Sequence, residues 1–340
     1  MPRLKLAVDA FNLGADQRGM GRFARTVLSG LAECADIDVT LVVRTRGDIA
    51  GAREESRGAV LALADARRQR FDAVWYPWNA LRFELSGTKI VTIHDAFAFT
   101  QAHRNPLARW REQRPIRQAI RRADILTTVS HWSARQIARV FALAPSRFEI
   151  VSPVPSAFWH PSAPAASGPY ILFVAGPDAR KNARMLFAAF QRAFPAGEVT
   201  LVIAGTLAGV DAAALSRTTM AYRLERPDDA GLRALYSGAL AVAIPSLSEG
   251  YGVMAVEAMA CGAAVVASDT AALPEACDGA ALLVAPTSVD EWAAALKRVA
   301  GLPSVRADLQ RRSLERAARI DRQRPATAFA ALVRRRVSGG

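Results

Sequence analysis

Short apolar runs alternate along the chain with stretches of helical periodicity. In the first half, the helical stretches cover residues 21–34, 107–122 and 133–141. Strands that alternate with helices favour parallel sheets whose faces are covered by those helices. The apolar runs between the helices predict strands at 4–9, 39–43, 73–76, 89–94, 124–129 and 148–151.

The alternation stops at residues 152–169, SPVPSAFWHPSAPAASGP, which are rich in Pro, Ser and Ala and show no periodicity. It then resumes, with strands expected at 170–174, 199–204, 240–244, 263–267 and 281–284. The pattern predicts an α/β protein with two Rossmann-like domains. We expect a first domain at 1–160, a linker at 161–169, a second domain at 170–320 and, within 321–340, an amphipathic helix that crosses back to the first domain.

A length of 340 residues suits two domains. With 51% of the residues apolar, the composition is that of a folded protein. No apolar run is long enough to span a bilayer, and the N-terminus does not resemble a secretory signal. The cysteines, Cys34, Cys261 and Cys277, form no metal or disulfide pattern, so we expect a cytoplasmic protein. The net charge of +13 favours contact with nucleic acid, anionic lipid or a phosphorylated ligand, unless it reflects coding bias.

The segment with the strongest chemical pattern is LAVAIPSLSEGYGVMAVEAMACGAAVVASD, which starts at Leu240. A buried strand leads into a loop with two glycines, and a helix begins near Val253. Free amides at a helix N-terminus suit a phosphate group, whereas carboxylates accept hydrogen bonds from hydroxyls. Glu249 precedes the helix and Glu257 lies in its second turn. The sequence therefore predicts a nucleotide-sugar site, with one glutamate at the sugar hydroxyls, the other at the ribose and the amides at the diphosphate.

The run E-G-Y-G-V-M-A-V-E-A-M-A-C-G, from Glu249, resembles the retaining glycosyltransferases of the GT-B fold, in the GT4-like group 1 that includes bacterial mannosyl- and glucosyltransferases. Tyr251 stands where the group usually has Phe, and Met254 begins a step that usually contains Pro. The resemblance implies an enzyme with two Rossmann-like domains that face a central cleft. It also implies that Glu249 binds the sugar hydroxyls and Glu257 the ribose, and that Gly250, Tyr251, Gly252 and Val253 help to bind the donor.

A second segment, YILFVAGPDARKNARMLF, places two cations between a strand and a helix. It resembles the R-K-N turn of the same family, although Pro177 stands where many relatives have Arg. The resemblance implies that Lys181 and Arg180 bind the donor diphosphate and stabilise its charge as the glycosidic bond breaks.

Two segments of the first domain complete the expected site. His94 and Asp95 end the strand at 89–94, and the resemblance implies that His94 lies near the transferred sugar; Asp95 either orients His94 or caps the next turn. Gly19, Gly21 and Arg22 resemble a flexible glycine loop of the family at the cleft. As a dinucleotide motif, this glycine pattern is incomplete.

The stretch at 103–124 combines many arginines with Trp110, and it predicts either an anionic-membrane or acceptor-phosphate surface or an ordinary solvated helix interrupted at Pro115. Asp36-Ile37-Asp38 matches a metal-binding D-x-D motif, but it precedes a strand and is interpreted as a turn. We therefore expect no metal and no other cofactor.

The resemblance implies a retaining enzyme that moves a hexose from a GDP- or UDP-linked sugar, preferentially GDP-mannose, to a glycan or lipid-linked acceptor in surface polysaccharide synthesis. Peripheral contact with the inner face of the plasma membrane is a further expectation. The alternatives are an epimerase or phosphorylase on the same architecture and, more distantly, a basic nucleic-acid-binding protein, for which no RNA or zinc motif is present.

Overall fold

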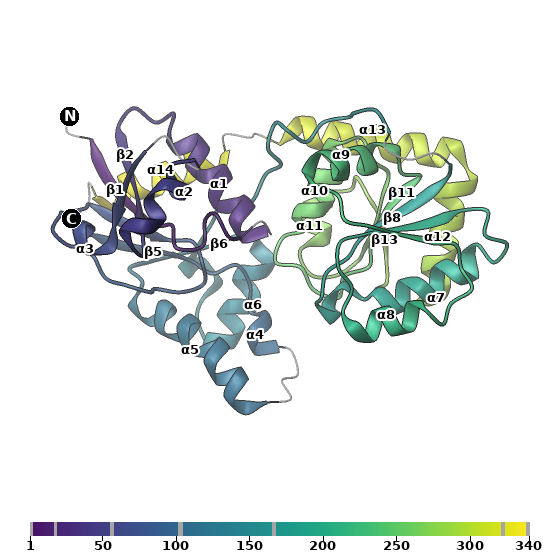
Figure 1. The fold of residues 1–340 in the computed structure, drawn as a ribbon, viewed down its shortest axis with the longest axis horizontal. Helices are drawn as coiled ribbons and strands as arrows, with labels where there is room; N and C mark the ends of the chain where they lie inside the picture. Colours follow the sequence, from purple (N-terminus) through teal and green to yellow (C-terminus); the bar gives the residue numbers. More distant parts are fainter. Residues whose placement is uncertain are drawn as a thin grey trace. The chain divides into compact units, whose positions relative to one another are not determined.

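The computed structural model describes residues 3–16, 19–54, 58–100, 105–164, 168–320 and 324–337. The chain divides into two units, Met1–Val154 with Arg322–Gly340, and Pro155–Asp321. Each unit is a parallel sheet with helices on both faces (Figure 1). Parts of the predicted linker, at 165–167, and of the basic stretch, at 103–104, lie outside the described residues.

The sheet of the first unit has the strand order β3-β2-β1-β4-β5-β6-β7, and every neighbouring pair is parallel. Its strands are β1 (Leu4–Asp9), β2 (Ile37–Val43), β3 (Ala59–Ala62), β4 (Ala73–Tyr76), β5 (Thr88–Thr92), β6 (Ile125–Thr128) and β7 (Phe148–Ile150). Its helices are α1 (Gly19–Leu31), α2 (Ile49–Glu54), α3 (Leu63–Ala66), α4 (Phe97–Thr100), α5 (Pro106–Arg122), α6 (His131–Phe141) and α14 (Arg324–Val337).

The C-terminal helix α14 packs beside α1 in the first unit (Figure 1). Phe329 inserts its ring against Trp75 of β4, with the ring centroids 4.6 Å apart. Arg334 forms two hydrogen bonds with the Asp36 carboxylate, at 2.6 and 2.7 Å. The first aspartate of the D-x-D motif is thus bound to an arginine, before the start of β2.

The sheet of the second unit has the order β10-β9-β8-β11-β12-β13. Its strands are β8 (Tyr170–Val174), β9 (Thr200–Ala204), β10 (Tyr222–Glu225), β11 (Ala241–Ile244), β12 (Val265–Ser268) and β13 (Leu282–Val284). Its helices are α7 (Ala183–Ala193), α8 (Gly209–Leu215), α9 (Asp229–Gly238), α10 (Val253–Ala260), α11 (Leu273–Cys277), α12 (Val289–Gly301) and α13 (Pro303–Arg319). Alternate strand residues enter two cores, one under α7 and α12 and the other under α9, α10 and α11.

The predicted fold class is confirmed, and each predicted strand is present in the structure. Two strands were missed, β3 and β10, and both are edge strands. Edge strands bury less surface than central ones, so their apolar signal is weaker; in β10 no residue is fully buried. One alternative for the basic stretch was a helix interrupted at Pro115, and this interruption is wrong, because α5 continues through that residue. Pro115 has no N–H that could donate to the carbonyl of Arg111, one turn earlier in the helix. Both residues are exposed, so water can bind this carbonyl instead.

The strand order reverses direction once in each sheet, between β1 and β4 in the first unit and between β8 and β11 in the second. In open parallel sheets, ligands bind beyond the carboxyl ends of the strands at such a reversal. The loops that follow β1, β4, β8 and β11 are therefore the segments in which functional side chains are expected.

Gly21 provides a test of how α1 packs. Both Gly19 and Gly21 lie in the first turn of α1, so the helix predicted from residue 21 begins two residues earlier. A Cβ atom at Gly21 would lie 1.7 Å from the Asp16 carbonyl oxygen, whereas one at Gly19 would meet nothing within 4 Å. We expect Gly21→Ala to lower the free energy of unfolding by about 1–3 kcal/mol, because the backbone must move.

Urea unfolding followed by circular dichroism measures this change, and Gly19→Ala is the matched control, with no loss expected. Equal stability of the two variants would contradict the packing of α1 against the Asp16 segment.

Candidate functional site

The turn after β8 is built by side chains that bind their own backbone. Asp178 accepts a hydrogen bond from the Arg180 backbone N–H at 3.0 Å and caps the short 3-10 helix Ala179–Lys181. Asn182 then adopts φ 59°, a left-handed conformation that Asn tolerates well, and α7 begins at the next residue. Its amide nitrogen donates to the carbonyls of Pro245 and Pro286, at 3.0 and 2.8 Å. The turn is thereby joined to the loops after β11 and β13.

The loop after β11 ends at Gly252, where α10 begins. Gly252 has φ +107°, and a Cβ atom there would lie 2.9 Å from a methyl carbon of Leu273. Both the conformation and the space require glycine. Earlier in the loop, the Leu247 backbone N–H donates to the Arg180 carbonyl at 2.8 Å, so this loop and the turn after β8 are held in register.

Glu249 connects the two segments through its carboxylate. Its Oε1 accepts hydrogen bonds from Lys181 Nζ and from the Ser246 hydroxyl, both at 2.8 Å. Its Oε2 accepts one from Arg180 Nη1, also at 2.8 Å. Arg180 in turn donates to the Ser248 carbonyl at 3.0 Å and to Asp178 Oδ2 at 2.9 Å. We call Arg180, Lys181 and Glu249 the ion cluster.

The ion cluster is charged at neutral pH. Burial acts to raise the pKa of Glu249, but the neighbouring Lys181 and Arg180 cations outweigh it and lower the pKa to about 2. For Arg180, burial acts to lower the pKa, and the carboxylates of Glu249 and Asp178 raise it above its ordinary value. A buried carboxylate therefore holds two cations beside the carboxyl ends of β8 and β11, where the strand order reverses.

The structure brings together only some of the residues predicted for the donor. Lys181, Arg180 and Glu249 form one hydrogen-bonded group, although the sequence assigned Glu249 to sugar hydroxyls and the cations to phosphate. Tyr251 is buried, Gly250 and Val253 are partly exposed, and Gly252 begins α10. Glu257 is buried in α10, 3% exposed.

His94 lies after β5 in the first unit, two residues beyond the end of the strand. Its Nε2 lies 2.8 Å from the Pro77 carbonyl oxygen, which can only accept, so Nε2 carries the proton. Burial lowers the pKa of His94, although the Pro77 carbonyl and Asp95 act in the other direction. The ring is therefore neutral at pH 7, and its Nδ1 keeps a lone pair. The edge contact with Phe23, with ring centroids 5.3 Å apart, fixes the ring against α1.

The other predicted residues of the first unit have local structural contacts. Asp95 Oδ1 accepts a hydrogen bond from the Phe97 N–H at 2.9 Å, so it caps the turn that leads into α4, one of the two roles that the sequence left open. Arg22 lies in the first turns of α1, and its carbonyl accepts a hydrogen bond from Thr26.

Asp9 is a titratable residue that the sequence analysis did not select. It ends β1 beside the reversal of the strand order, and its side chain is fully buried. Oδ1 accepts a hydrogen bond from the Phe11 N–H at 3.0 Å, while Oδ2 has no partner among the described residues. Burial raises the pKa of Asp9 to about 6, against the lowering effects of this hydrogen bond and of Arg82 and Arg44. An acidic residue at the end of the apolar run LKLAVD was the available signal.

Comparison with known proteins shows what the second unit is similar to. Residues 168–301 match the family described as "Glycosyl transferases group 1", and the matched region contains the entire ion cluster. The second unit is thus similar to this family over residues 168–301, and we call these residues the group 1 domain. O-antigen chain mannosyltransferase B of Escherichia coli is 28% identical over 226 residues, which are 59% of this chain and 58% of that protein. The chain thus spans somewhat more than half the length of this relative.

Solved structures show the same fold around this group 1 domain. Sucrose-phosphate synthase from Thermosynechococcus elongatus superposes with a TM-score of 0.76 over 99% of this chain and 100% of that chain, at 17% identity. HepE of Anabaena, solved in complex with UDP and glucose, gives 0.71 over 97% and 99%, at 14% identity. The two parallel α/β domains have the GT-B fold of these glycosyltransferases.

None of the helices in the described ranges is long and apolar enough to cross a membrane. Within the same residues, no group of three or more His, Cys, Asp or Glu side chains is arranged to hold a metal ion.

The pKa of Glu249 predicts how stability of the group 1 domain depends on pH. Because its folded pKa of about 2 lies below the ordinary value of 4.5, its stabilisation is present above pH 4.5 and is lost as the pH falls toward 2. We expect Glu249→Gln to lower the free energy of unfolding by about 3 kcal/mol at neutral pH. Chemical denaturation across this pH range measures the difference, which should vanish near pH 2. The exposed Glu291→Gln is the control, and a pH-independent loss in Glu249→Gln would contradict the ion cluster.

Asp9 predicts the opposite pH dependence in the first domain. Its folded pKa of about 6 lies above the ordinary value of 3.8, so the folded state binds the proton more tightly. Stability therefore falls as the pH rises from 3.8 to 6, by about 3 kcal/mol for this group. Asp9→Asn keeps the acceptor for Phe11, and the difference between the wild-type and variant unfolding profiles should show this slope. Parallel profiles would mean that Asp9 ionises normally.

Proposed function

We propose that the protein is a glycosyltransferase that moves a hexose from a nucleoside-diphosphate sugar. The observation that supports this most is the ion cluster, which lies inside the group 1 domain at the reversal between β8 and β11. Two cations fixed beside the start of α10 suit a diphosphate, because the helix N-terminus adds free amides and a positive dipole end. The related fold of HepE, solved with UDP and glucose, supports the same class of donor.

In this proposal the cations stabilise the leaving group. Lys181 has three N–H groups, of which one donates to Glu249 and another is directed at the Met254 sulfur at 3.8 Å. The third is available to a phosphate oxygen. Negative charge grows on the diphosphate as the glycosidic bond breaks, and charges positioned in advance lower the energy of that state. Glu249 acts as a positioning residue, since it fixes both cations.

The first domain contributes a neutral group to the reaction. The lone pair on Nδ1 of His94 accepts a hydrogen bond from a hydroxyl of the transferred sugar. We propose retention of the anomeric configuration, with the acceptor oxygen attacking on the face that the diphosphate leaves. The C–O bond to phosphate breaks, the new glycosidic bond forms, and the donor phosphate takes the acceptor proton.

We propose mannose from GDP-mannose as the first donor to test, because a relative is named as a mannosyltransferase. The UDP bound by HepE keeps the UDP-linked sugars as second candidates. The acceptor is a glycan or a lipid-linked saccharide of surface polysaccharide synthesis, at the cytoplasmic side of the membrane. An epimerase or phosphorylase is distinguished by product analysis, because a transferase releases nucleoside diphosphate at a rate that depends on the acceptor.

A thermal-shift screen with UDP, GDP, ADP and their sugars tests the donor site. We expect one base to raise the melting temperature, and Lys181→Ala to remove most of that rise. Loss of a charge-assisted hydrogen bond weakens binding by about 1.5–3 kcal/mol, roughly ten- to a hundred-fold in Kd. The exposed Lys297→Ala, which removes a lysine from α12 of the same domain, should bind like the wild type. No shift with any nucleotide, or equal shifts in both variants, would refute the proposed site.

A further inference from the structure

Strand β10 forms one edge of the sheet in the second unit, and it exposes large apolar side chains. Tyr222 is 42% and Leu224 59% exposed, and no residue of the strand is fully buried. The other edge strands, β3, β7 and β13, are described throughout and contain no exposed large apolar side chain. Proteins usually shield the edges of their sheets, since an exposed apolar edge pairs readily with another chain. The edge at β10 therefore has the features of an interaction surface.

The backbone of β10 also has groups that point away from the sheet. The Leu201 N–H of β9 donates to the Ala221 carbonyl at 2.9 Å, so the backbone groups of Ala221, and of alternate residues after it, point to β9. Those of Tyr222, Leu224 and Arg226 point to the other side, where no strand of the described residues lies. These N–H and C=O groups can pair with a further strand.

The sequence along this edge, Y-R-L-E-R from Tyr222, is complementary to itself in one antiparallel register. When Leu224 lies opposite Leu224 of a second copy, the two residues exchange both backbone hydrogen bonds, because their groups point outward. Arg223 then lies opposite Glu225, and Tyr222 opposite Arg226. Pairs of opposite charge and pairs of arginine with an aromatic ring both stabilise neighbouring strands. Two-fold symmetry makes each of these pairs occur twice.

The charges of β10 select this register over its neighbours. A two-fold axis at Arg223 would place the two Arg223 side chains opposite each other, and like charges in that position destabilise a sheet. An axis at Tyr222 would place Arg223 opposite Ala221, without a charged partner. Within one chain, Arg223 Nε lies 2.6 Å from Glu225 Oε1, and the two side chains are 41% and 37% exposed. Both charges are therefore accessible to a second copy.

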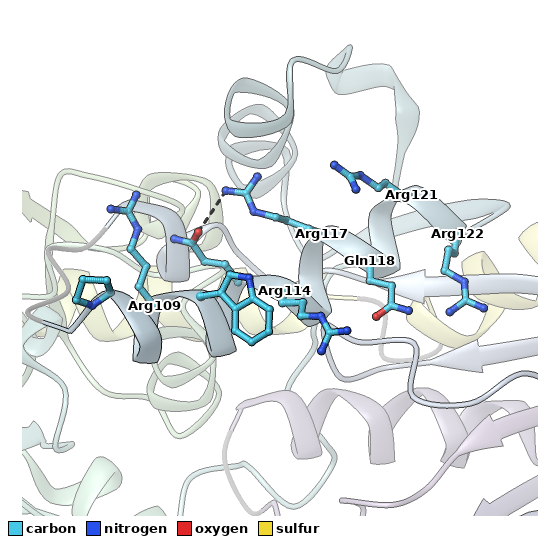
Figure 2. A pocket seen from close by; sticks show the side chains of 9 residues that line it. Arg109, Arg114, Arg117, Gln118, Arg121 and Arg122 are labelled. Atoms are coloured by element: carbon cyan, nitrogen blue, oxygen red, sulfur yellow. Dashed lines mark hydrogen bonds between the residues drawn. The ribbon is translucent and has the colours of Figure 1, made fainter.

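Helix α5 shows what an exposed apolar surface looks like when it does not match itself. Leu107 is 54% and Trp110 55% exposed on this helix. They lie among cations, however: Figure 2 shows Arg109, Arg114 and Arg121 along the same groove of about 520 Å³. A second copy placed there would bring charges of one sign together. Of these two surfaces, the edge at β10 is the one whose charges attract a copy of itself.

We propose that two copies of the chain pair through their β10 strands, antiparallel, with the two-fold axis at Leu224. The two sheets then continue into each other. The pairing uses the edge of the sheet and not the ends of its strands, so the ion cluster at the carboxyl ends of β8 and β11 stays open. The proposal goes beyond the transfer reaction and does not depend on it, since strand pairing requires neither nucleotide nor acceptor. So short a pair of strands lies at the small end of known interfaces, below about 1,200 Å², so we expect a dimer that forms at micromolar concentration.

Sedimentation equilibrium of the full chain tests the dimer. Between about 1 and about 100 μM, we expect the mass to rise from 36.5 kDa toward twice that value. Glu225→Arg places arginine opposite arginine, and Arg223→Glu places glutamate opposite glutamate. Each variant alone should dimerise roughly ten- to a hundred-fold more weakly, because two attractive pairs become repulsive. An equimolar mixture of the two variants should restore the dimer, because opposite charges face each other again.

The control is Glu315→Arg on α13, which makes the same change of charge at an exposed glutamate that also pairs with an arginine, Arg311. It should dimerise within about two-fold of the wild type, and circular dichroism should show all variants folded. A wild type that stays monomeric over the whole range would overturn the proposal. So would a dimer that persists in both charge variants, or a mixture of the two variants that remains monomeric.

Discussion

The buried carboxylate of Glu249 is the interaction on which the second domain depends. Arg180 and Lys181 are neighbours in the chain, and two cations so close repel each other unless an anion lies between them. Glu249 supplies it, and its own burial is tolerated only because both cations contact it, at 2.8 Å each. The contact joins residues 68 positions apart, so it forms only when β8 and β11 are adjacent. The buried charges of the site are therefore stable only when the strands of the sheet have this order.

Further hydrogen bonds fix the loops around the ion cluster relative to one another. Asn182 binds the carbonyls of Pro245 and Pro286, and the Leu247 N–H binds the Arg180 carbonyl, so three loops keep a fixed register at the carboxyl ends of the strands. Charges held in place before a ligand arrives need no reorganisation when it binds. This changes the interpretation of the glutamate pair in the sequence motif. Glu249 orders the cations, whereas Glu257 is buried in α10 and remains a predicted ribose contact.

The central strands and the strand-end motifs could be predicted from the sequence, because buried parallel strands give continuous apolar runs and the loops after them contain glycine and charged residues. The edge strands β3 and β10 could not, since their apolar pattern is weak. The contact of Lys181 with Glu249 was also beyond the sequence, because spacing says nothing about which oxygen faces which nitrogen. Asp9 was missed for a related reason: a carboxylate at a strand end looks solvated until its burial is known.

The two domains differ in charge at their strand reversals, and this difference bears on what each can bind. In the second domain, the reversal holds an ionised cluster with two cations, which suits phosphate oxygens. In the first, Asp9 at the reversal has a pKa of about 6, and burial lowers the pKa of His94, which follows β5. Each of these side chains therefore loses its charge more readily than an ordinary Asp or His. Side chains that lose their charge readily suit the hydroxyl groups of a ligand, since they can form hydrogen bonds with them without attracting a counter-ion. The cations of α5 lie outside this division: they occur on a helix face and not at a strand end, so they add positive charge to the first domain without placing it at His94.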